Sequence, residues 1–348
     1  GSNQRTDQEE TAMRSLLILA LSGAALWAAA APVLADPVEV KFAYPSAPNN
    51  ALFAQGAEGW AKDVTAASDG AIAVKVFPGG VLGDNTNMYD RITGGVVDIG
   101  LAVFGPVSSV FPKTNVGTLP FETKNHREDA LALWRLYEKG VIADEFAKVR
   151  PLGFIAFPPL VLHAKKPIHD LADMKGLKVS VEGRVLSTLM PRLGAAPISL
   201  QPGELYQSLQ RGLVDAVAQG WPSVPTFHLD EVTNFHLEVP LGNNTGFVFM
   251  NNDSYAKLPE KGRAAIDKFS GEAYVLRLAR ADDAMVARGR EATVKMKGQT
   301  IASLAPDEEA RWKALVAPVT EEWVKATPDG ARVLAAFRRE VAAIRAGH

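Results

Sequence analysis

The chain has 348 residues, of which 47% are hydrophobic and 22% charged, as expected of a globular protein large enough to form two lobes. Its formal net charge of -2 argues against binding to nucleic acid, which needs a basic surface. It contains no cysteine, which excludes disulfides, thiolate metal sites and cysteine nucleophiles.

The N-terminal part has the pattern of a secretory signal. Arg14 is followed by an apolar run over 16–31 and by small residues before Ala35, which predicts a signal peptide at 13–35. A transmembrane anchor is the alternative, but the run is short and alanine-rich and has no charged stop-transfer flank. Residues 1–12 are polar and are interpreted as a cloning remnant or an over-extended start. The mature protein is expected in the periplasm, assuming a Gram-negative source.

The first half of the chain predicts alternating strands and helices. Apolar, β-branched runs indicate strands, and apolar residues at helical spacing indicate helices. The predicted strands are Val38–Ala43, Ala71–Phe77, Val96–Val103 and Pro151–Leu162, and the predicted helices are 53–64, Asn85–Ile92 and Arg127–Tyr137. Asn49 lies in the loop between the first strand and the first helix. It is expected either to cap that helix or to help its N-terminus receive an anion.

The stretch Gly176–Trp221 predicts three strands alternating with two helices. The predicted elements are a strand through Val179 and Val181, a helix Val185–Leu193, a strand Pro197–Leu200, a helix Glu204–Arg211 and a strand Val214–Ala218. This alternation indicates parallel strands, and ligands of open α/β sheets lie beyond the carboxyl ends of such strands. Those ends fall near 180–184, 201–203 and 219–221.

The remaining third predicts one strand and four helices. They are the strand Gly246–Asn251 and the helices Pro259–Lys268, Ala273–Lys297, Asp307–Val316 and Arg332–Ala346. His228 and His236 are eight residues apart without a metal-binding motif, so no metal site is expected there. The sequence also lacks a nucleophile elbow, a Walker loop and a dinucleotide fingerprint, so it predicts a protein that is not an enzyme and has no cofactor.

Several spaced motifs resemble one family, the DctP-type solute-binding proteins of tripartite ATP-independent periplasmic (TRAP) transporters. The motifs are FPGGVLG at 77–83, GGVVDIG at 94–100, LPF at 119–121, DMKGLKV at 173–179, RLGAAPISL at 192–200 and GELYQSLQRGLVDA at 203–216. The resemblance covers about 38–268. It implies an α/β, two-lobed periplasmic binding protein fold, in which each lobe is a sheet flanked by helices and a long helix spans both. The implied division is 36–157 plus 246–285 for lobe I and 158–245 plus 286–348 for lobe II.

The resemblance also implies a ligand site between the lobes. Family members usually carry an arginine at the third position of a K-x-R pattern, where it pairs with a substrate carboxylate, but this chain has Ser180 there. One hypothesis is that Arg184 replaces the missing charge. Another is that the ligand has no carboxylate at that point and the site is lined by Phe104, Phe157 and Trp221. A third is that Arg184 merely begins a helix at the surface.

The remaining site residues follow from the same comparison with the family pattern. Phe104 is expected to form an aromatic wall or, equally, to belong to the core, and Phe157 is expected near the cleft floor. Glu182 and Gln219 lie at predicted strand ends, and Trp221 is able to stack on a planar ligand. Asp215 is expected to make hydrogen bonds at a strand end.

The resemblance predicts a monomeric receptor that captures a small organic acid and delivers it to TRAP membrane permease subunits. A monocarboxylate with a hydrophobic or aromatic body is the preferred ligand. The alternative is the same transport role with a neutral or non-carboxylate ligand, and a periplasmic enzyme on the same scaffold is less favoured. The sequence does not distinguish a receptor that feeds a permease from one that feeds a sensor.

Overall fold

The computed structural model describes residues 36–48 and 54–348. The predicted signal peptide at 13–35, residues 1–12 and Asn49 lie outside these ranges. Residues 37–348 form one compact unit. Within the described part of the chain, no helix combines the length and hydrophobicity that a membrane crossing needs.

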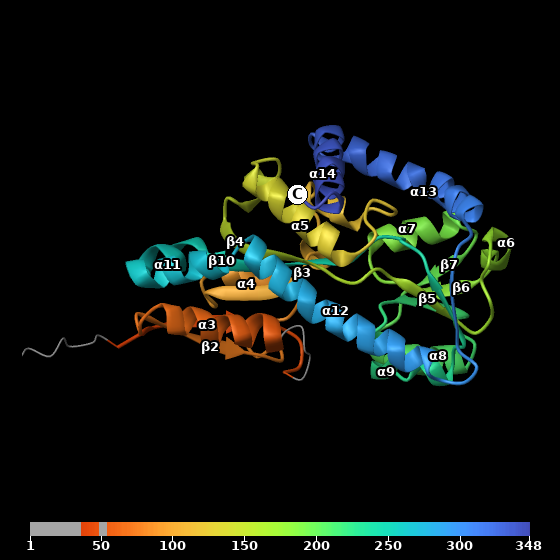
Figure 1. The fold of residues 1–348 in the computed structure, drawn as a ribbon, viewed down its shortest axis with the longest axis horizontal. Helices are drawn as coiled ribbons and strands as arrows, with labels where there is room; N and C mark the ends of the chain where they lie inside the picture. Colours follow the sequence, from red (N-terminus) through yellow and green to blue (C-terminus); the bar gives the residue numbers. More distant parts are fainter. Residues whose placement is uncertain (1–35, 49–53) are drawn as a thin grey trace, which may run out of the picture. The chain divides into compact units, whose positions relative to one another are not determined.

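The first sheet has five strands in the order β2-β1-β3-β10-β4. They are β1 (Val38–Ala43), β2 (Ile72–Phe77), β3 (Ile99–Val103), β4 (Val149–Ala156) and β10 (Thr245–Asn251). β1 pairs in parallel with β2 and β3, whereas β10 pairs antiparallel with both β3 and β4. Every residue of β10 is buried, because it has a strand on each side and helices cover the sheet (Figure 1). The strand predicted at Gly246–Asn251 is therefore confirmed and belongs to the first sheet.

The second sheet has six strands in the order β11-β9-β5-β8-β6-β7. They are β5 (Val161–Ala164), β6 (Lys178–Ser180), β7 (Ala196–Ile198), β8 (Ala216–Gln219), β9 (Phe235–Glu238) and β11 (Thr300–Ser303). β6 pairs in parallel with β7 and β8, as the alternating pattern of 176–221 predicts. Asp215 accepts a hydrogen bond from Lys178 N at 2.9 Å, which confirms its role at the strand end.

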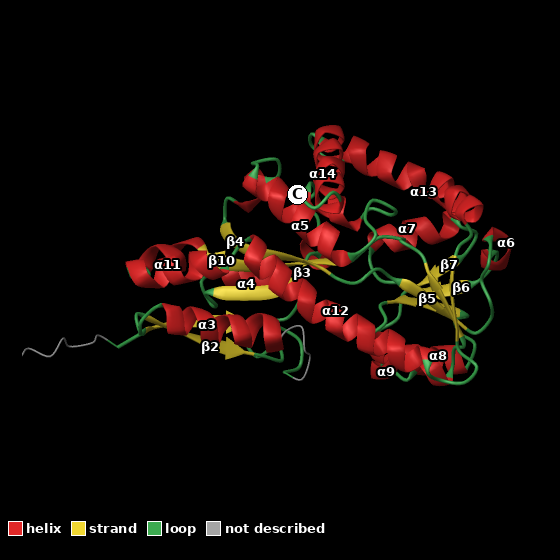
Figure 2. Cartoon of the chain, viewed as in Figure 1, coloured by secondary structure: helices red, strands yellow, loops and turns green. Residues whose placement is uncertain are grey.

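Helices flank both sheets (Figure 2). They are α3 (Gly59–Ala67), α4 (Met88–Thr93), α5 (His126–Glu138), α6 (Leu171–Met174), α7 (Arg184–Arg192), α8 (Leu205–Gln210), α9 (Ser223–Thr226), α10 (Asn252–Lys257), α11 (Glu260–Phe269), α12 (Glu272–Val294), α13 (Pro306–Ala326) and α14 (Gly330–Arg345). The long helix α12 packs against α5 and β4 on the side of the first sheet and against α9 on the side of the second. It is therefore the predicted helix that spans both lobes.

The last helix, α14, departs from the predicted division of the chain. Val333, Phe337 and Val341 are buried in the core cluster of the first sheet, where α14 packs against α5. The prediction placed all of 286–348 in lobe II, but α14 lies with the first sheet. The sequence does not indicate this position, because an amphipathic pattern shows that one face of a helix is buried and does not specify which surface covers it.

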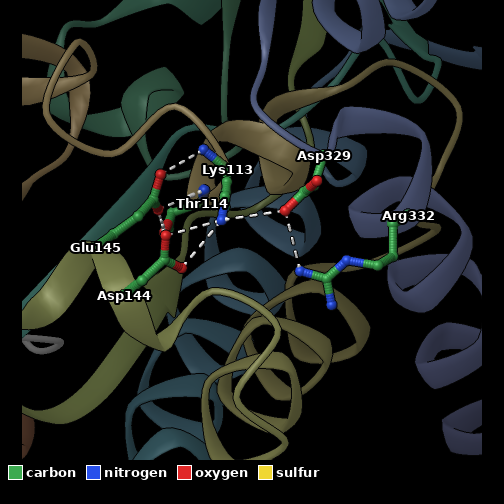
Figure 3. A network of polar contacts seen from close by, with 6 residues as sticks. All are labelled: Lys113, Thr114, Asp144, Glu145, Asp329 and Arg332. Atoms are coloured by element: carbon green, nitrogen blue, oxygen red, sulfur yellow. Dashed lines mark hydrogen bonds and ion pairs between the residues drawn. The ribbon is translucent and has the colours of Figure 1, made fainter.

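A polar network fixes the start of α14 (Figure 3). The buried Lys113 places its Nζ 2.8 Å from Asp144 Oδ2 and 3.8 Å from Asp329 Oδ2. Asp329 precedes α14 in a left-handed conformation and also accepts from Arg332 at 3.3 Å. Glu145 accepts from the backbone N–H of Lys113 at 2.6 Å. These contacts join the beginning of α14 to segments that precede the first sheet's β4.

Two of the segments that connect the sheets are fastened together. Residues 157–160 lead from β4 to β5, so the stretch predicted as one strand over Pro151–Leu162 forms two strands, and 239–244 lead from β9 to β10. Phe157 N donates to Asn244 O at 2.8 Å. In the second segment Gly242 has φ +109, and a Cβ there would lie 2.5 Å from Thr118 O. Only glycine fits this position without displacing backbone.

A buried aspartate holds the same connecting segment from the side of α5. Asn243 Nδ2 donates to Asp129 Oδ2 at 2.8 Å and to Thr123 Oγ1 at 3.0 Å. Asp129 is fully buried, and no described residue pairs with its second carboxyl oxygen. Burial raises the pKa of Asp129 to about 8. The carboxyl group is therefore neutral at pH 7.

Candidate functional site

The carboxyl ends of β6 and β8 lie side by side at one edge of the second sheet. Ser180, at the end of β6, pairs in register with Val217 of β8, and Gln219 ends β8 two residues later. Ser180 is 3% exposed, whereas Gln219 is half-buried. The pairing brings together two residues that the sequence analysis assigned to the ligand site from separate motifs.

Phe157 reaches the same region from the segment that follows β4. Its ring is half-buried and lies against Gly246, where a Cβ would be 3.3 Å from Phe157 Cε2. The next residue, Pro158, is close to Gly220, since a Cβ on this glycine would lie 3.9 Å from Pro158 Cβ. The segment after β4 and the segment after β8 are thus in contact.

Phe104 is a core residue in this structure. It is 1% exposed, and its ring lies 5.2 Å from Phe111 and Phe247 and 5.8 Å from Phe249, centroid to centroid. Such edge-to-face packing is typical of an aromatic core. Of the two expectations for Phe104, the structure supports the core and not a wall exposed to a ligand.

Trp221 is also buried, with neighbours around its ring. It is 3% exposed, and the rings of His163 and His236 lie 5.3 Å from it. Its indole N–H donates to Glu238 at 3.0 Å, and the guanidinium of Arg290 lies 5.9 Å from the ring centroid. The ring has no open face for stacking on a ligand in this structure. Its contacts are those of a buried packing residue.

The remaining predicted residues are Glu182, Arg184 and Asn49. Glu182 is exposed in the loop after β6 and is followed by Gly183, whose φ of +84 favours glycine. α7 begins at Arg184. Asn49 lies outside the described residues.

Sequence reasoning missed the histidine pair. His163 Nδ1 lies 2.7 Å from His236 Nδ1, and His163 Nε2 donates to Gln219 O at 3.2 Å. Burial and the neighbouring His236 lower the pKa of His163 to about 3, and burial also lowers the pKa of His236. Both rings are therefore neutral at pH 7. Their 73-residue separation left no local signal, because the contact arises from the pairing of β5 with β9.

His228 does not join this pair. It is exposed, and its Nδ1 lies 3.7 Å from Glu231 Oε1. Among residues 36–48 and 54–348 no group of three or more His, Cys, Asp or Glu side chains is arranged to hold a metal ion. The histidine pattern seen in the sequence therefore corresponds to a packing contact for His236 and to a surface residue for His228.

Two cavities are described, and neither is lined by the predicted site residues. One, of about 410 Å³, lies between α13, α14 and the loop at 120–122. The other, of about 640 Å³, is a polar depression lined by parts of α8, the 230–234 loop and residues 297–299. Of the residues assigned to the ligand site, Ser180 and Gln219 lie at the ends of β6 and β8, whereas Phe104 lies in the core of the first sheet.

Known proteins resemble this chain closely in fold and more weakly in sequence. A TRAP solute-binding protein from Rhodoferax ferrireducens, solved with copurified benzoate, is 31% identical, with a TM-score of 0.78 over 88% of this chain and 98% of that chain. One from Bordetella bronchiseptica, solved with bound (R)- and (S)-mandelate, is 26% identical, with a TM-score of 0.77 over 88% of this chain and all of that chain.

The C4-dicarboxylate-binding periplasmic protein DctP of Rhodobacter capsulatus is 26% identical over 89% of this chain and 93% of its own. The model of the family called bacterial extracellular solute-binding protein, family 7, matches residues 44–326. This match takes in every strand of both sheets except β1 and the helices from α3 to α13, and so the chain belongs to the DctP family, the periplasmic solute-binding proteins of TRAP transporters.

Proposed function

We propose that this protein captures a monocarboxylate with an aromatic or otherwise bulky apolar body and delivers it to TRAP membrane permease subunits. It is a periplasmic organic-acid-binding protein of a family whose members are not enzymes. The narrower ligand class rests chiefly on Ser180. At the position where relatives usually carry an arginine, this chain has a buried, uncharged side chain at the end of β6.

The number of cations in the site limits how many charges a bound ligand can carry. A compact dicarboxylate brings two charges into a site that excludes water, and an unpaired charge there costs several kcal/mol, roughly 3–5 when one partner of a buried pair is removed. Loss of the arginine at Ser180 therefore disfavours a dicarboxylate more than a monocarboxylate. The benzoate and mandelate of the two solved relatives are monocarboxylates with an aromatic body, which supports the same class.

Arg184 is the proposed cation for the single carboxylate. It begins α7 four residues after Ser180, at the edge of the sheet where Gln219 also lies. A guanidinium has a planar fork that pairs with both carboxylate oxygens, so one arginine suffices for a monocarboxylate. Gln219 is proposed to add an amide that both donates and accepts, and the half-buried Phe157 to contact the apolar body.

Capture is proposed to work by a shift between open and closed arrangements of the two sheets. A ligand that contacts both sheets only when they are closed favours the closed form by its extra contacts. Closure also removes water, which strengthens each polar contact to the carboxylate. A neutral ligand is the second candidate, because Ser180 supplies a hydroxyl and no charge.

The test is a thermal-shift screen of residues 36–348 with matched pairs of acids and amides. Benzoate and mandelate are compared with benzamide and mandelamide, and succinate represents the dicarboxylates. A ligand at about 100 times its Kd adds roughly 2.7 kcal/mol to the free energy of unfolding. We expect stabilisation by the aromatic acids alone. Equal stabilisation by the amides would favour the neutral class, and stabilisation by succinate alone would refute the proposal.

A further inference from the structure

Glu238 and Arg290 lie at the same sheet edge as Gln219, although neither stands out in the sequence. Glu238 is the last residue of β9, and the register places Gln219 and Glu238 on either side of Val161 at the beginning of β5. Arg290 comes from the spanning helix α12. The end of β8, the end of β9 and the long helix α12 therefore meet here.

The two side chains are joined to each other and to Trp221. Arg290 Nε donates to Glu238 Oε1 at 2.8 Å, and its Nη2 donates to Oε2 at 3.3 Å. Glu238 Oε1 also accepts the Trp221 indole N–H at 3.0 Å. One carboxylate thus receives both a charged and a neutral donor, and charge-assisted bonds of this kind are the stronger ones.

The backbone of Trp221 touches α12 as well. A Cβ at Gly289 would lie 2.6 Å from Trp221 O, so the helix approaches this segment as closely as a glycine permits. Val286, one turn earlier, packs against the cluster that contains Trp221, and Leu278, two turns before that, belongs to a core cluster of the first sheet. The Trp221 segment is thus held by a helix whose other half is anchored in the first sheet.

Stability alone does not account for the pair. The Arg290 side chain is 45% exposed and that of Glu238 32%, and ion pairs at such positions contribute roughly 0–1 kcal/mol because water screens them. Their geometry bears on the indole N–H, which Glu238 Oε1 accepts, and Trp221 follows the end of β8 at Gln219 by two residues. A misplacement of Gln219 would weaken a ligand contact without unfolding the protein.

We infer that Glu238 and Arg290 form a positioning pair that holds the Gln219–Trp221 segment in its ligand-binding arrangement. This inference rests on the proposed function for its choice of ligand. Neither residue needs to touch the ligand. The pair acts through Trp221, which has His163 and His236 as its other ring neighbours.

The experiment compares Arg290→Gln with Arg288→Gln. Arg288 is on the same helix, is exposed, and donates to the backbone oxygen of Ala284 in its own helix, so it is a matched control. Benzoate affinity is measured by calorimetry. In parallel, 5-fluorotryptophan is incorporated and the fluorine resonance of Trp221 is assigned with Trp221→Phe. Arg290→Lys keeps the charge but lacks the fork.

We expect Arg290→Gln to weaken benzoate binding about tenfold or more and to move the Trp221 resonance in the ligand-free protein, with Arg288→Gln unchanged in both. Arg290→Lys should recover only part of each effect. The inference is overturned if Arg290→Gln leaves the resonance in place, because a loss of affinity would then mean direct contact with the ligand. It is overturned equally if the resonance moves and the affinity does not.

If the wild-type protein binds neither benzoate nor mandelate, these two acids are not its ligands. The fluorine spectrum of the ligand-free variants then decides separately whether the pair orients Trp221. An unmoved resonance in ligand-free Arg290→Gln would reject the pair in this case too.

Discussion

Replacing Asp129 with asparagine should stabilise the protein, and by an amount that depends on pH. The pKa of this carboxyl is raised by burial from 3.8 to about 8. Between these two values the folded protein retains a proton that the unfolded chain has released. Folding is therefore penalised by about 1.4 kcal/mol for each pH unit in this window, and the penalty stops growing above the folded pKa.

At pH 7 the penalty reaches about 4 kcal/mol as an upper limit, since pH 7 is roughly three units above the ordinary pKa of the group. Asparagine has the same shape and does not titrate. Its amide oxygen is able to accept from Asn243 as Asp129 Oδ2 does. The Asp129→Asn variant should match the wild type near pH 4, exceed it increasingly up to about pH 8, and keep a constant advantage above that.

The assay is urea unfolding at pH 5, 6, 7 and 8 and constant ionic strength. Asp90→Asn is the control, because Asp90 is exposed on α4 and makes no side-chain hydrogen bond in the described structure. A difference between Asp129→Asn and the wild type that stays constant from pH 5 to pH 8 would refute the reasoning. It would mean that Asp129 is ionised in the folded protein throughout this range.

Three further substitutions test the connecting segments and the site. Gly242→Ala should destabilise the protein by about 1–3 kcal/mol in urea unfolding, because the new Cβ meets the Thr118 carbonyl oxygen at 2.5 Å and the φ is +109; a neutral result would show that the segment relaxes freely. Phe104→Ala should cost about 3–5 kcal/mol in the same assay, as expected of a buried ring, and a stable variant that has lost only benzoate affinity would restore the ligand-wall role. Arg184→Ala should lower benzoate affinity at least tenfold in calorimetry, and an unchanged Kd would remove Arg184 from the site.

The elements that the sequence predicted well are those with a local signal. β10 follows from a continuous apolar run, and α12 from a long helical pattern that no proline interrupts. α13 was predicted to end at Val316, whereas it continues to Ala326 through Pro318. Proline normally ends a helix, but here Val316 and Val319 are both buried on one face, and tertiary packing outweighs the lost backbone hydrogen bond.

The parts that were missed depend on which distant segments become neighbours. The contact between His163 and His236 requires β5 to pair with β9, and the shielding of Trp221 requires α12 to pass beside it. Phe104 illustrates the same limit, since an aromatic residue after a strand looks alike in a core and in a ligand wall. The sequence pattern predicted the carboxyl ends of β6 and β8. Whether a side chain near them is exposed depends on contacts with distant segments, which leave no local pattern.

The position of β10 has a consequence for the order in which the protein can fold. β10 lies between β3 and β4, so the first sheet has a gap in its middle until residue 251 has been synthesised, and its core stays uncovered until α14 is complete near the C-terminus. An emerging chain therefore has no finished domain to fold early. For a periplasmic protein this is an advantage, because a polypeptide that folds only when almost all of it is present remains extended enough to be threaded across the membrane first.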